Sequence, residues 1–490
     1  MTTHTANKES FISYCKSKMT EASPTDIKLI ESAFDFASKT HKGQTRASGK
    51  DYFKDHCLSV AYHILDLGMD TPLVCAALLH DTIEDTETTP QDLQAKFGDE
   101  IAYLVEGVTK LDKVQYLGNE RHVESLRKFF ISVAQDLRVV ILKLADRWHN
   151  LETLKYLDEE RQQHIAAESI MIFAPLASRL GMGKLVSTIN DLAFPYAYPE
   201  QYAKTKSFMD TQLKQSASTI TKMYRDLNVD LHTTLGYTPS IDKRVKGVYS
   251  LYKKLERYDW DIDRVYDLVA LRAIVKEISD CYRALGAIHE HWRPLPHRIK
   301  DFIAVPKPNG YQSLHTTVFS GDGLKVEIQI RTAEMHEFDE YGIASHHSYK
   351  MKQFQKGLGD ESFAWVEQLR EFQKANISPN DYLKRLGTDI IQDRIFVFTP
   401  KGDVIDLPVG ATILDFAYAV HSQVGDHASG GRVNDKFVAL KTPLQSEDIV
   451  EIVTNSKSHP SDKWVEQCVT SLALGHIRRY IKKQHDLVTS

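Results

Sequence analysis

The first 200 residues carry apolar side chains at the spacing of an α-helix. In residues 27–37 and 101–108 the apolar positions recur three or four residues apart, which is the pattern of an amphipathic helix. Residues 73–79 and 139–144 are apolar on every side, as in helices buried in a core. Alternation with a period of two residues, which is typical of a half-buried strand, is scarce in this region. The pattern therefore predicts an all-α domain over residues 1–200.

The pattern changes after Leu235. Residues 265–275 and 325–330 are short apolar runs rich in β-branched side chains, and they predict strands. A helix is expected between them at 279–292, and glycine and proline punctuate the residues that follow it. A polar helical connector comes before the first of these strands. Strands interleaved with helices predict an α+β or α/β domain with a mixed sheet over residues 201–352.

The last part of the chain is expected to hold a small β-rich module. Residues 353–390 predict a polar helical linker, and residues 391–455 predict a compact module of β-grasp size. The remaining residues, 456–490, predict a helical segment that ends in a basic run and has no obvious partner within the chain. The strands and the helix of the module are expected at 394–399, 403–407, 449–454 and 413–420.

Composition and charge narrow the class of protein without identifying a function. A chain of 490 residues is too long for one hydrophobic core, so we expect about three domains. The net charge of −5 gives no overall basic surface for nonspecific nucleic-acid binding. The five cysteines are widely spaced without a CxxC pair, so neither a disulfide framework nor a zinc cluster is expected. No segment is long and apolar enough to span a membrane, and the N-terminus lacks the pattern of a signal peptide, so we expect a cytoplasmic protein.

The strongest chemical signal lies at the end of the apolar run that begins at Thr71. His80, Asp81, Glu84 and Asp85 follow this run, and on one continuous helix the residues of each i, i+4 pair would share a face. Three carboxylates and an imidazole at the edge of a core are costly unless a positive charge compensates them, and a metal ion is the usual compensation. The alternative is a solvated C-terminal turn, although the negative end of the helix dipole disfavours acidic residues there.

Two further residues complete a metal-binding pattern. His56 comes before an amphipathic helix, and Asp146 follows the apolar run RVVILKLA. With His80 and Asp81 they form the pattern H…HD…D, whose nitrogen and oxygen donors suit Mn²⁺, Zn²⁺ or Fe²⁺ better than Mg²⁺. A metal there would lower the pKa of a bound water and supply hydroxide near neutral pH, and the acidic pair one turn further on could orient that water or move its proton. Unrelated polar residues at helix ends are the alternative explanation.

Five motifs surround these residues, namely HDTIEDT, GVTKL, LRKFF, KLADRWHNLETL and APLASRLG. Together they resemble the hydrolase domain of the long RelA/SpoT homologues, which are bifunctional synthetase/hydrolases of the alarmone (p)ppGpp. In that family an all-α HD domain uses Mn²⁺ to remove the 3′-pyrophosphate, giving GDP or GTP and pyrophosphate. The resemblance implies that the metal ligands are His56, His80, Asp81 and Asp146, and that the catalytic acidic pair is Glu84 and Asp85. It also implies a nucleoside pocket in which the planar guanidinium of one arginine stacks on guanine, formed by Arg46, Ser48, Asn150 and Thr153.

Two longer motifs, DFIAVPKPNGYQSLHTTV and VEIQIRT, resemble the nucleotidyltransferase-like synthetase domain of the same family. There the 3′-OH of GDP or GTP attacks the β-phosphate of ATP, which requires cations on the triphosphate and a carboxylate-held Mg²⁺. The resemblance implies that ATP is contacted by Arg244, Lys246 and Lys254, and that Mg²⁺ is served by Asp267 and Glu327. It implies that the acceptor nucleotide is held by Tyr311, which stacks on guanine, and by Lys307, Asn309 and His315. The run Arg298–Asp301 is the basic form of a signature that accompanies a working hydrolase in this family.

The hydrolase part departs from the family pattern at two places. The segment between Tyr52 and His56 is one residue longer than usual, which bears on the placing of Arg46. Ser125 stands where the family has Asn. Neither departure touches the predicted metal ligands.

The synthetase part departs further. Gly247 replaces a histidine and Lys243 a glycine in the ATP-binding segment, while Asp339 and His347 replace alanine and tryptophan. A glycine there adds backbone freedom and removes a side chain, and a lysine cannot adopt positive φ cheaply. These changes predict a weak or degenerate synthetase beside an active hydrolase.

The leading hypothesis is therefore a Mn²⁺-dependent (p)ppGpp 3′-pyrophosphohydrolase. The first alternative is a balanced bifunctional enzyme that also transfers pyrophosphate from ATP to GDP or GTP. The second is a protein whose synthetase fold only binds guanine nucleotide as a regulatory site. Intact Asp267, Glu327 and Tyr311 keep both alternatives open.

The stretch from Asp393 to Leu440 resembles a TGS domain, a small β-grasp module. In long family members this module senses partners such as the tRNA 3′ end on the ribosome or acyl carrier protein. The resemblance implies that His421 makes the tRNA contact, and a surface histidine after a helix is the alternative.

Overall fold

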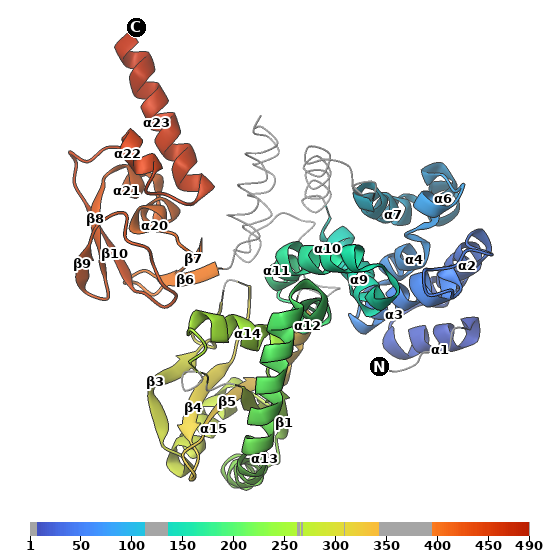
Figure 1. Cartoon of the computed structure of the whole chain (residues 1–490), viewed down its shortest axis with the longest axis horizontal. Coiled ribbons are helices and arrows are strands. Elements are labelled where there is room, and N and C mark those ends of the chain that lie inside the picture. The colour runs from blue at the N-terminus through green and yellow to red at the C-terminus, as the bar shows by residue number, and fades with distance from the viewer. Residues whose placement is uncertain are drawn as a thin grey trace. The chain divides into compact units, whose positions relative to one another are not determined.

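The computed structural model (Figure 1) describes residues 7–112, 136–261, 265, 268–307, 309–342 and 394–489. The chain divides into two compact units, Met1–Gln373 and Lys374–Ser490, and each is described by itself. The predicted linker at 353–390 lies outside the described residues. None of the helices in the described part of the chain combines the length and the hydropathy that a membrane crossing needs.

The N-terminal part of the first unit is a bundle of helices, as the sequence predicts. Its α-helices are α1 (Lys8–Lys18), α2 (Pro24–Thr40), α3 (Leu58–Asp66), α4 (Thr71–Leu79), α5 (Thr82–Asp85), α6 (Pro90–Phe97), α7 (Asp99–Asp112), α9 (Leu137–Glu152), α10 (Glu159–Glu168), α11 (Ala174–Arg179) and α12 (Gly183–Ala197). Shorter turns join them: two π-helical turns, Phe53–Cys57 and Ser169–Phe173, and a 3-10 turn, Leu154–Tyr156.

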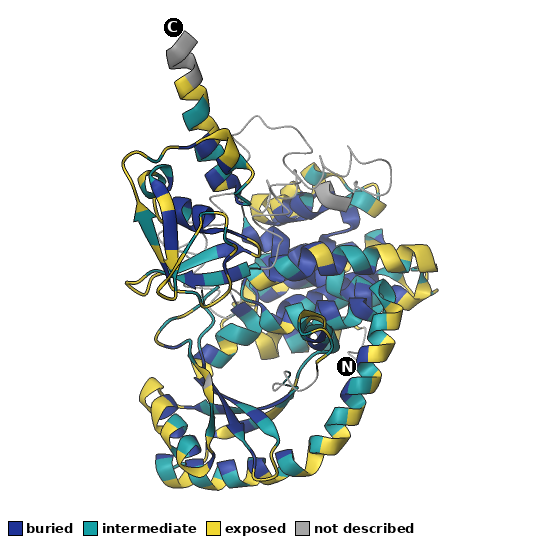
Figure 2. Ribbon diagram, turned by 60° about the vertical axis from the view of Figure 1, so that its left-hand side comes forward, coloured by how far each residue is buried: buried dark blue, intermediate teal, exposed yellow. Residues whose placement is uncertain are grey.

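Helix α4 lies at the centre of this bundle. Asp70 caps its first turn by accepting a hydrogen bond from the Leu73 amide at 3.2 Å, and Pro72 fits the same turn because a first-turn amide has no helical partner. Every side chain from Leu73 to Leu79 is 0% exposed, and α2, α3, α7 and α9 pack around it. Figure 2 shows many buried positions, in dark blue, inside the helical bundle. The run that is apolar on every side is therefore enclosed by other helices, as expected.

The C-terminal part of the first unit contains a mixed sheet. Its strands are β1 (Ser240–Val245), β2 (Val269–Val275), β3 (Pro294–Asp301), β4 (Leu314–Phe319) and β5 (Lys325–Thr332). Their spatial order is β1-β2-β5-β4-β3, in which β2 and β5 are parallel and the other neighbours antiparallel. The helices of this part are α13 (Pro199–Leu235), α14 (Val248–Arg257), α15 (Ile278–His291) and α16 (Ala333–Tyr341). The predicted mixed-sheet domain is confirmed.

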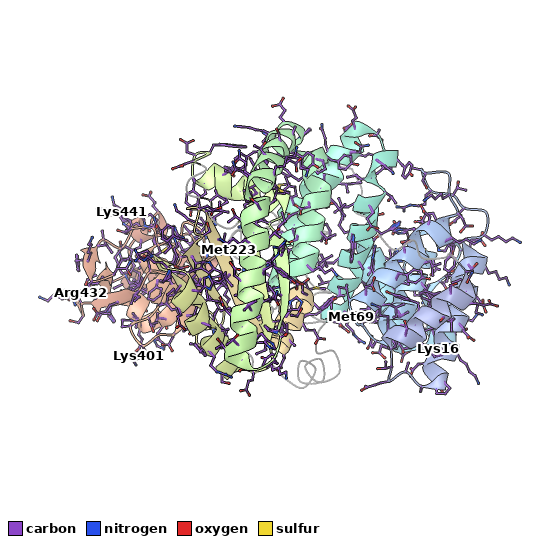
Figure 3. The ribbon with its side chains drawn as sticks, turned by 90° about the horizontal axis from the view of Figure 1, so that it is seen from below. Lys16, Met69, Met223, Lys401, Arg432 and Lys441 are labelled. Atoms are coloured by element: carbon purple, nitrogen blue, oxygen red, sulfur yellow. The ribbon has the colours of Figure 1, made fainter. Side chains whose placement is uncertain are left out.

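The long helix α13 covers one face of the sheet (Figure 1). Ile220, Met223, Leu227 and Leu231 recur at helical spacing and form a core with the strands and with α15. Met223 is labelled on this helix in Figure 3. The helix ends at Gly236, whose φ of 77° is the left-handed conformation that glycine adopts without strain.

The second unit is a small β-rich module followed by two helices. Its strands are β6 (Arg394–Phe398), β7 (Val404–Pro408), β8 (Ala428–Val433), β9 (Lys436–Val438) and β10 (Val450–Thr454). Strands β6 and β7 form one hairpin, and β8 lies between β10 and β9 in a second sheet. The helices are α20 (Ile413–Val420), α21 (Ser422–Asp426), α22 (Asp462–Val465) and α23 (Ser471–Thr489). Helix α20 packs on strands of both sheets.

The tail helix α23 packs against α20. Ala473 and Ile477 are both 0% exposed and form a cluster with Leu414 and Tyr418 of α20. The prediction that this segment has no partner within the chain is therefore wrong. The contact joins apolar positions far apart in sequence, which a local periodic pattern does not reveal.

A buried carboxylate ties the tail to the module. Asp415 is 0% exposed and accepts hydrogen bonds from the amides of Thr412, Val469 and Thr470 at 2.9, 3.1 and 2.8 Å. The Thr470 hydroxyl donates to it as well, at 2.8 Å. This many donors satisfy a charge that would otherwise be costly to bury.

Candidate metal centre and nucleotide sites

The apolar helix α4 ends where its polar residues begin. The sequence predicts one helix over Thr71–Asp85, but the structure interrupts it at His80. The Nδ1 atom of His80 bonds the Ala77 carbonyl at 2.8 Å, and the Thr82 hydroxyl donates to the Leu79 carbonyl at 2.6 Å. In a continuous helix these carbonyls accept from amides four residues later, so the side chains compete with the helix. The prediction of one continuous helix with shared i, i+4 faces is therefore wrong.

The four predicted metal ligands converge at this interruption. The Nε2 atom of His56 lies 3.1 Å from Nε2 of His80 and 3.1 Å from Oδ2 of Asp81. The Oδ1 atom of Asp146 lies 3.4 Å from His56 Nε2 and 3.9 Å from His80 Nε2. All four side chains are buried. His56, His80 and Asp146 offer buried ligand atoms within 4.8 Å of one another, which is close enough to hold one divalent metal ion. Asp81 adjoins His56 and His80, and with Cys57 and His80 it forms a second such group of buried donors.

Burial and neighbouring groups set the protonation of this cluster. Burial lowers the pKa of His56, so its imidazole is neutral and offers a lone pair. Burial opposes the ionisation of Asp81, but His80 and His56 outweigh it and hold its pKa well below the usual range. Burial is likewise outweighed at Asp146, where Lys143 donates to Oδ2 at 2.8 Å and the pKa of the carboxyl is lowered. Neutral imidazole and ionised carboxylate are the states that metal ligands need.

The π-helical turn Phe53–Cys57 brings His56 to the cluster. The Leu58 amide bonds the carbonyl five residues back, so this turn holds one residue more than an α-helical turn. A turn of this width takes up one more residue, which is the extra length predicted between Tyr52 and His56. His56 faces the other three predicted ligands.

His149 lies directly behind His56. Their Nδ1 atoms are 2.8 Å apart, and both rings are buried. Burial lowers the pKa of His149 to about 2, so its ring is neutral and its Nδ1 can accept a hydrogen bond. With the shared proton on His56 Nδ1, the lone pair of His56 Nε2 faces His80 and Asp146. A neutral His149 is thus compatible with the tautomer that a metal-binding histidine requires.

Tyr52 connects the cluster to the predicted catalytic acids. Its hydroxyl lies 2.8 Å from Oδ2 of Asp81 and 2.7 Å from Oδ2 of Asp85. Burial and the nearby carboxylates raise the pKa of Tyr52 far above its ordinary value, so the hydroxyl keeps its proton. Asp85 is exposed and Glu84 half-buried on the short helix α5. Helix α5 therefore presents this acidic pair next to the four ligands.

Two of the four predicted nucleoside contacts lie beside the cluster. Arg46 donates from Nη2 to Oδ1 of Asn150 at 2.7 Å, and Asn150 donates from Nδ2 to Oδ1 of Asp146 at 2.7 Å. The guanidinium carbon of Arg46 is 5.4 Å from the centre of the Tyr52 ring. The longer segment before His56 therefore does not separate Arg46 from the site.

The other two predicted contacts bond to their own surroundings. The Ser48 hydroxyl donates to Oδ2 of Asp55 at 3.2 Å. The Thr153 hydroxyl donates to the carbonyls of His149 and Asn150 at 3.1 and 3.3 Å, at the end of α9. Their contacts with a nucleoside stay predictions.

Two of the predicted acceptor residues, Tyr311 and His315, belong to one hydrogen-bonded network on the sheet. The Tyr311 hydroxyl lies 2.6 Å from Nε2 of His315, whose Nδ1 lies 3.4 Å from Oε1 of Glu327. Gln329 donates to the same Oε1 at 2.7 Å, and Arg331 donates to the Tyr311 hydroxyl at 3.2 Å. Gln329 and Arg331 are not among the residues predicted from the sequence. Their period-two spacing from Glu327 on β5 was the available signal, because alternate residues of a strand share a face.

The predicted ATP contacts come from β1 and α14. Arg244, near the end of β1, donates to Oε1 of Gln329 at 3.2 Å, which joins it to the acceptor network. Lys246 follows the strand and Lys254 lies on α14. Asp267, the predicted Mg²⁺ ligand, lies outside the described residues.

Lys307 and Asn309 lie in the loop between β3 and β4. The Nζ atom of Lys307 is 4.7 Å from the ring centres of both Phe302 and Tyr311. Asn309 accepts a hydrogen bond from the Tyr311 amide at 3.3 Å and donates to the Ser178 carbonyl at 3.4 Å. Both side chains therefore lie at the tyrosine that is predicted to stack on guanine.

Two of the departures in the segment predicted to bind ATP have a different effect from the one expected. Lys243 pairs with Leu271 in the regular ladder of β1 and β2, and it is not among the described residues with positive φ. Gly247 has φ −60° and ψ 147°, which any residue adopts. The expected backbone strain and the expected use of glycine's freedom are therefore both wrong.

Asp339 changes the chemistry of the acceptor network. Its carboxylate forms a salt bridge with the guanidinium of Arg331, a side chain that is 0% exposed. A carboxylate at this position neutralises a buried cation that would otherwise face the network. The other two departures, Ser125 and His347, lie outside the described residues.

His421 lies between α20 and α21 in the second unit. Its Nδ1 accepts a hydrogen bond from the Gln423 amide at 3.2 Å, and its side chain is exposed. This bond caps the start of α21. A contact of His421 with a partner stays a prediction.

Three residues of the metal cluster were missed by sequence reasoning. Lys143 and His149 each lie three positions from Asp146 on α9, and that spacing puts all three on one side of the helix. Tyr52 lies four positions before His56. Helical spacing around each predicted ligand was therefore the signal that could have found them.

Three family profiles match consecutive parts of the chain. The HD domain matches residues 33–183, the region found in RelA/SpoT proteins matches residues 243–354, and the TGS domain matches residues 395–454. The chain belongs to the RelA/SpoT family. An HD hydrolase domain implies dependence on a divalent metal, and three of the four predicted ligands of this RelA/SpoT chain, His56, His80 and Asp146, are grouped closely enough to hold one.

Curated relatives of this RelA/SpoT chain carry the names of both activities. A GTP pyrophosphokinase of Myxococcus xanthus is 43% identical, over 94% of this chain and 61% of that protein. A guanosine-3′,5′-bis(diphosphate) 3′-pyrophosphohydrolase of Aquifex aeolicus is 40% identical, over 94% of this chain and 66% of that protein. A 3′-pyrophosphohydrolase of the same name in Spiroplasma citri is 40% identical, over 95% and 64%. The chain therefore spans 61 to 66% of the length of these three relatives.

Proposed function

We propose that this RelA/SpoT chain hydrolyses (p)ppGpp, releasing the 3′-pyrophosphate and leaving GDP or GTP, with Mn²⁺ bound by His56, His80, Asp81 and Asp146. One observation carries the proposal: two buried imidazoles and two buried carboxylates converge beside the acidic pair of α5, of which Asp85 is exposed and Glu84 half-buried. Mixed nitrogen and oxygen donors favour Mn²⁺ over Mg²⁺. The printed names of two relatives supply the substrate class.

A divalent ion held by these four residues would lower the pKa of a bound water and supply hydroxide near neutral pH. The remaining steps belong to the protein's own side chains. The Tyr52 hydroxyl lies between the carboxylates of Asp81 and Asp85, at 2.8 and 2.7 Å, and its single proton can be donated to one of them at a time. Asp85 is thereby placed to take a proton from the attacking water, and Glu84 on the same turn of α5 is the second candidate for that transfer. Lys143 offsets part of the negative charge on Asp146.

The substrate's base is expected to lie over Arg46. Its guanidinium is fixed by Asn150, which is itself bonded to the metal ligand Asp146, so the orientation of the base is coupled to the cluster. A planar guanidinium stacks well on a purine. Displacement of Arg46 from the Tyr52 ring, 5.4 Å away, would open a face for this stacking.

A second activity is transfer of pyrophosphate from ATP to GDP or GTP, with Mg²⁺ at Glu327. The network that joins Arg244, Tyr311, His315 and Glu327 supports this second activity. We propose that this activity is weak. Asp339 neutralises the buried guanidinium of this network, so less positive charge is left to stabilise transferring phosphates. The alternatives are a balanced bifunctional enzyme and a sheet domain that only binds guanine nucleotide for regulation.

A paired assay on one preparation tests these readings. One tube holds Mn²⁺ and ppGpp, and the other holds Mg²⁺, ATP and GDP. Asp81→Ala should lower hydrolysis at least about 100-fold, because it removes a metal ligand, and should leave transfer within about twofold. Glu87→Ala, an exposed acid just beyond α5, is the matched control and should change neither rate.

Each outcome of the assay selects one reading. Hydrolysis by Asp81→Ala at the wild-type rate would contradict the proposed site. Transfer as fast as hydrolysis in the wild-type chain would support the balanced enzyme. Binding of GDP without any transfer would support the regulatory site.

For the TGS module, we propose that His421 contacts a tRNA 3′ end or acyl carrier protein. Its exposure at the end of α20 is the observation that supports this. Binding of each partner to the wild-type chain and to His421→Ala is the test. Equal affinity of both chains for both partners would contradict the contact.

A further inference from the structure

Helix α12, the last helix of the bundle, contacts the helix that follows the ATP-binding segment. Asp191 and Phe194 lie three residues apart on α12 and share a face. Phe194 is 0% exposed, and its ring centre lies 5.2 Å from that of Tyr249 and 5.1 Å from that of Tyr252, both on α14. Figure 1 shows α12 beside α14. One face of α12 is therefore packed on the start of α14.

Asp191 uses this contact to cap α14. Its Oδ1 accepts a hydrogen bond from the Tyr249 amide at 3.0 Å, and the Val248 amide also bonds the carboxylate. These amides belong to the first turn of α14, where they have no helical partner. The residue at the capping position is Gly247, which has no side chain to do this, so the cap comes from another part of the chain.

The absence of a side chain at Gly247 is what makes room for that carboxylate. A Cβ atom placed on Gly247 would lie 2.5 Å from Oδ2 and 3.0 Å from Oδ1 of Asp191. Real Cβ contacts are essentially never that short, and the atom it meets is the end of a side chain that can rotate. Any larger residue would therefore push the carboxylate away from the α14 amides.

We propose that Asp191 is a positioning residue for the nucleotide-transfer site. The segment it fixes runs from Arg244 through Lys246 to Gly247, which is the segment predicted to contact ATP. At its other end this segment is held by the β1 ladder, where Arg244 pairs with Ala270, and by the Lys246 amide, which bonds a carbonyl at 3.0 Å. Asp191 supplies the remaining anchor, so the turn between strand and helix is restrained on both sides. The proposal rests on the proposed transfer function, because it concerns its ATP contacts.

The start of the same helix also contacts the acceptor loop. A Cβ on Gly181, just before α12, would lie 3.1 Å from the carbonyl oxygen of Asn309, and one on Gly183 would lie 2.6 Å from that of Asp339. Asn309 in turn donates to the Ser178 carbonyl at 3.4 Å. On the acceptor side, the backbone at the start of α12 therefore packs against the backbone of Asn309 and Asp339. On the side predicted to bind ATP, the Asp191 carboxylate caps α14. Helix α12 thus contacts both halves of the predicted site.

The test uses the full chain and four variants: Asp191→Ala, Asp191→Asn, Gly247→Ala and the double variant Asp191→Ala/Gly247→Ala. Hydrogen exchange is measured on the peptide that contains the Val248 and Tyr249 amides, and affinity for ATP with Mg²⁺ is measured by calorimetry. Hydrolysis of ppGpp reports that each variant is folded. Glu200→Ala, an exposed acid at the start of α13, is the matched control.

Asp191→Ala should speed exchange of these amides about fivefold, the factor expected for loss of a helix cap, and should weaken ATP binding by a similar factor. Asp191→Asn keeps an oxygen acceptor and should stay within about twofold of wild type on both measurements. Gly247→Ala should resemble Asp191→Ala, because it displaces the same carboxylate. In the double variant the second change should add almost nothing, since the cap is already lost.

Unchanged exchange in Asp191→Ala would overturn the proposal, and so would additive effects in the double variant. ATP affinity that stays at the wild-type value while exchange speeds up would show that the cap does not position the ATP contacts, which also overturns it. A wild-type chain that binds no ATP yet protects these amides would refute the proposed transfer function while supporting the cap. The two failures are thus distinguishable.

Discussion

Replacement of His149 by leucine tests the arrangement behind the metal cluster. The variant His149→Leu removes the ring that faces Nδ1 of His56 at 2.8 Å and leaves a buried polar nitrogen beside an apolar side chain. An unsatisfied buried donor costs about 1–3 kcal/mol. A metal on Nε2 forces the His56 ring to keep this orientation, whereas the metal-free ring can turn, so the cost falls mainly on the bound state.

The expected magnitude follows from that cost. Because about 1.4 kcal/mol is a factor of ten in affinity, the Kd for Mn²⁺ should rise by roughly 5- to 150-fold. Loss of a hydrogen-bond partner behind a metal-binding histidine typically weakens metal binding by about 10–100-fold, which agrees with this range. We expect a rise of about tenfold or more.

Calorimetric titration of Mn²⁺ into metal-free protein measures this directly. The matched control is His63→Gln, because His63 lies 3.3 Å from the Glu152 carboxylate and its ring centre is 3.8 Å from that of Trp148. Its ring centre is 6.3 Å from that of His149, so the control changes a neighbouring histidine and leaves the bond between His149 and His56 in place. It should stay within about threefold of wild type. Hydrolysis by His149→Leu should recover at saturating Mn²⁺. A Kd equal to that of the wild-type chain would refute the reasoning, whatever the rate of hydrolysis.

Three further predictions follow from other contacts. Tyr52→Phe should lower kcat for ppGpp hydrolysis about tenfold at saturating Mn²⁺, because it removes the hydroxyl that bonds Asp85, a predicted catalytic acid. Initial rates measure this, and an unchanged kcat would contradict it. Glu168→Gln should lower the free energy of unfolding by about 1–3 kcal/mol at pH 7, since Glu168 bonds Arg147 at 2.8 Å. Burial opposes the ionisation of Glu168, but Arg147 outweighs it, so the folded-state pKa of Glu168 lies below 4.5. In urea unfolding, the difference in unfolding free energy between wild type and variant should be complete above pH 4.5 and should be lost as pH falls through the folded-state pKa. A difference that is independent of pH would contradict this. Gly342→Ala should destabilise the chain by at least about 2 kcal/mol, because φ is 56° and the added Cβ would lie 2.1 Å from a carbonyl oxygen. Gly286→Ala, where the added Cβ would meet no atom, should stabilise the chain by about 0.5–1 kcal/mol because it lies on helix α15. Thermal unfolding compares the two variants, and equal shifts in Tm would contradict the reasoning.

The elements that the sequence predicts well are those that local periodicity decides. The helix expected at 413–420 is α20, and the strand expected at 325–330 is β5, extended to Thr332. The interruption at His80 is different. It depends on the side chains of His80 and Thr82, which bond backbone carbonyls that would otherwise accept from helix amides. A pattern of apolar positions carries no information about that competition.

The candidate site shows the same division. Residue types and the family resemblance point to the four side chains that converge on one point. The partner of His56 is harder to find, because His149 lies 93 residues away in sequence. Contacts of that range follow from the packing of α3 against α9, which is a tertiary outcome.

The departures in the synthetase part show where a residue-by-residue comparison misleads. Lys243 looks costly against a family glycine, yet it lies in an ordinary strand. Gly247 looks like a lost side chain, yet the space is taken by the carboxylate of Asp191 from another helix. A substitution is therefore interpreted correctly only when the atoms that fill the vacated space are known.

The carboxylate of Asp415 has a practical consequence for anyone who isolates the C-terminal module. The TGS match stops at residue 454, whereas the amide donors that Asp415 needs lie at Val469 and Thr470. A fragment that ends at residue 454 would leave the buried Asp415 carboxylate without these donors. It would also expose the apolar side of α20 that packs against α23. The smallest piece expected to remain folded therefore extends into α23.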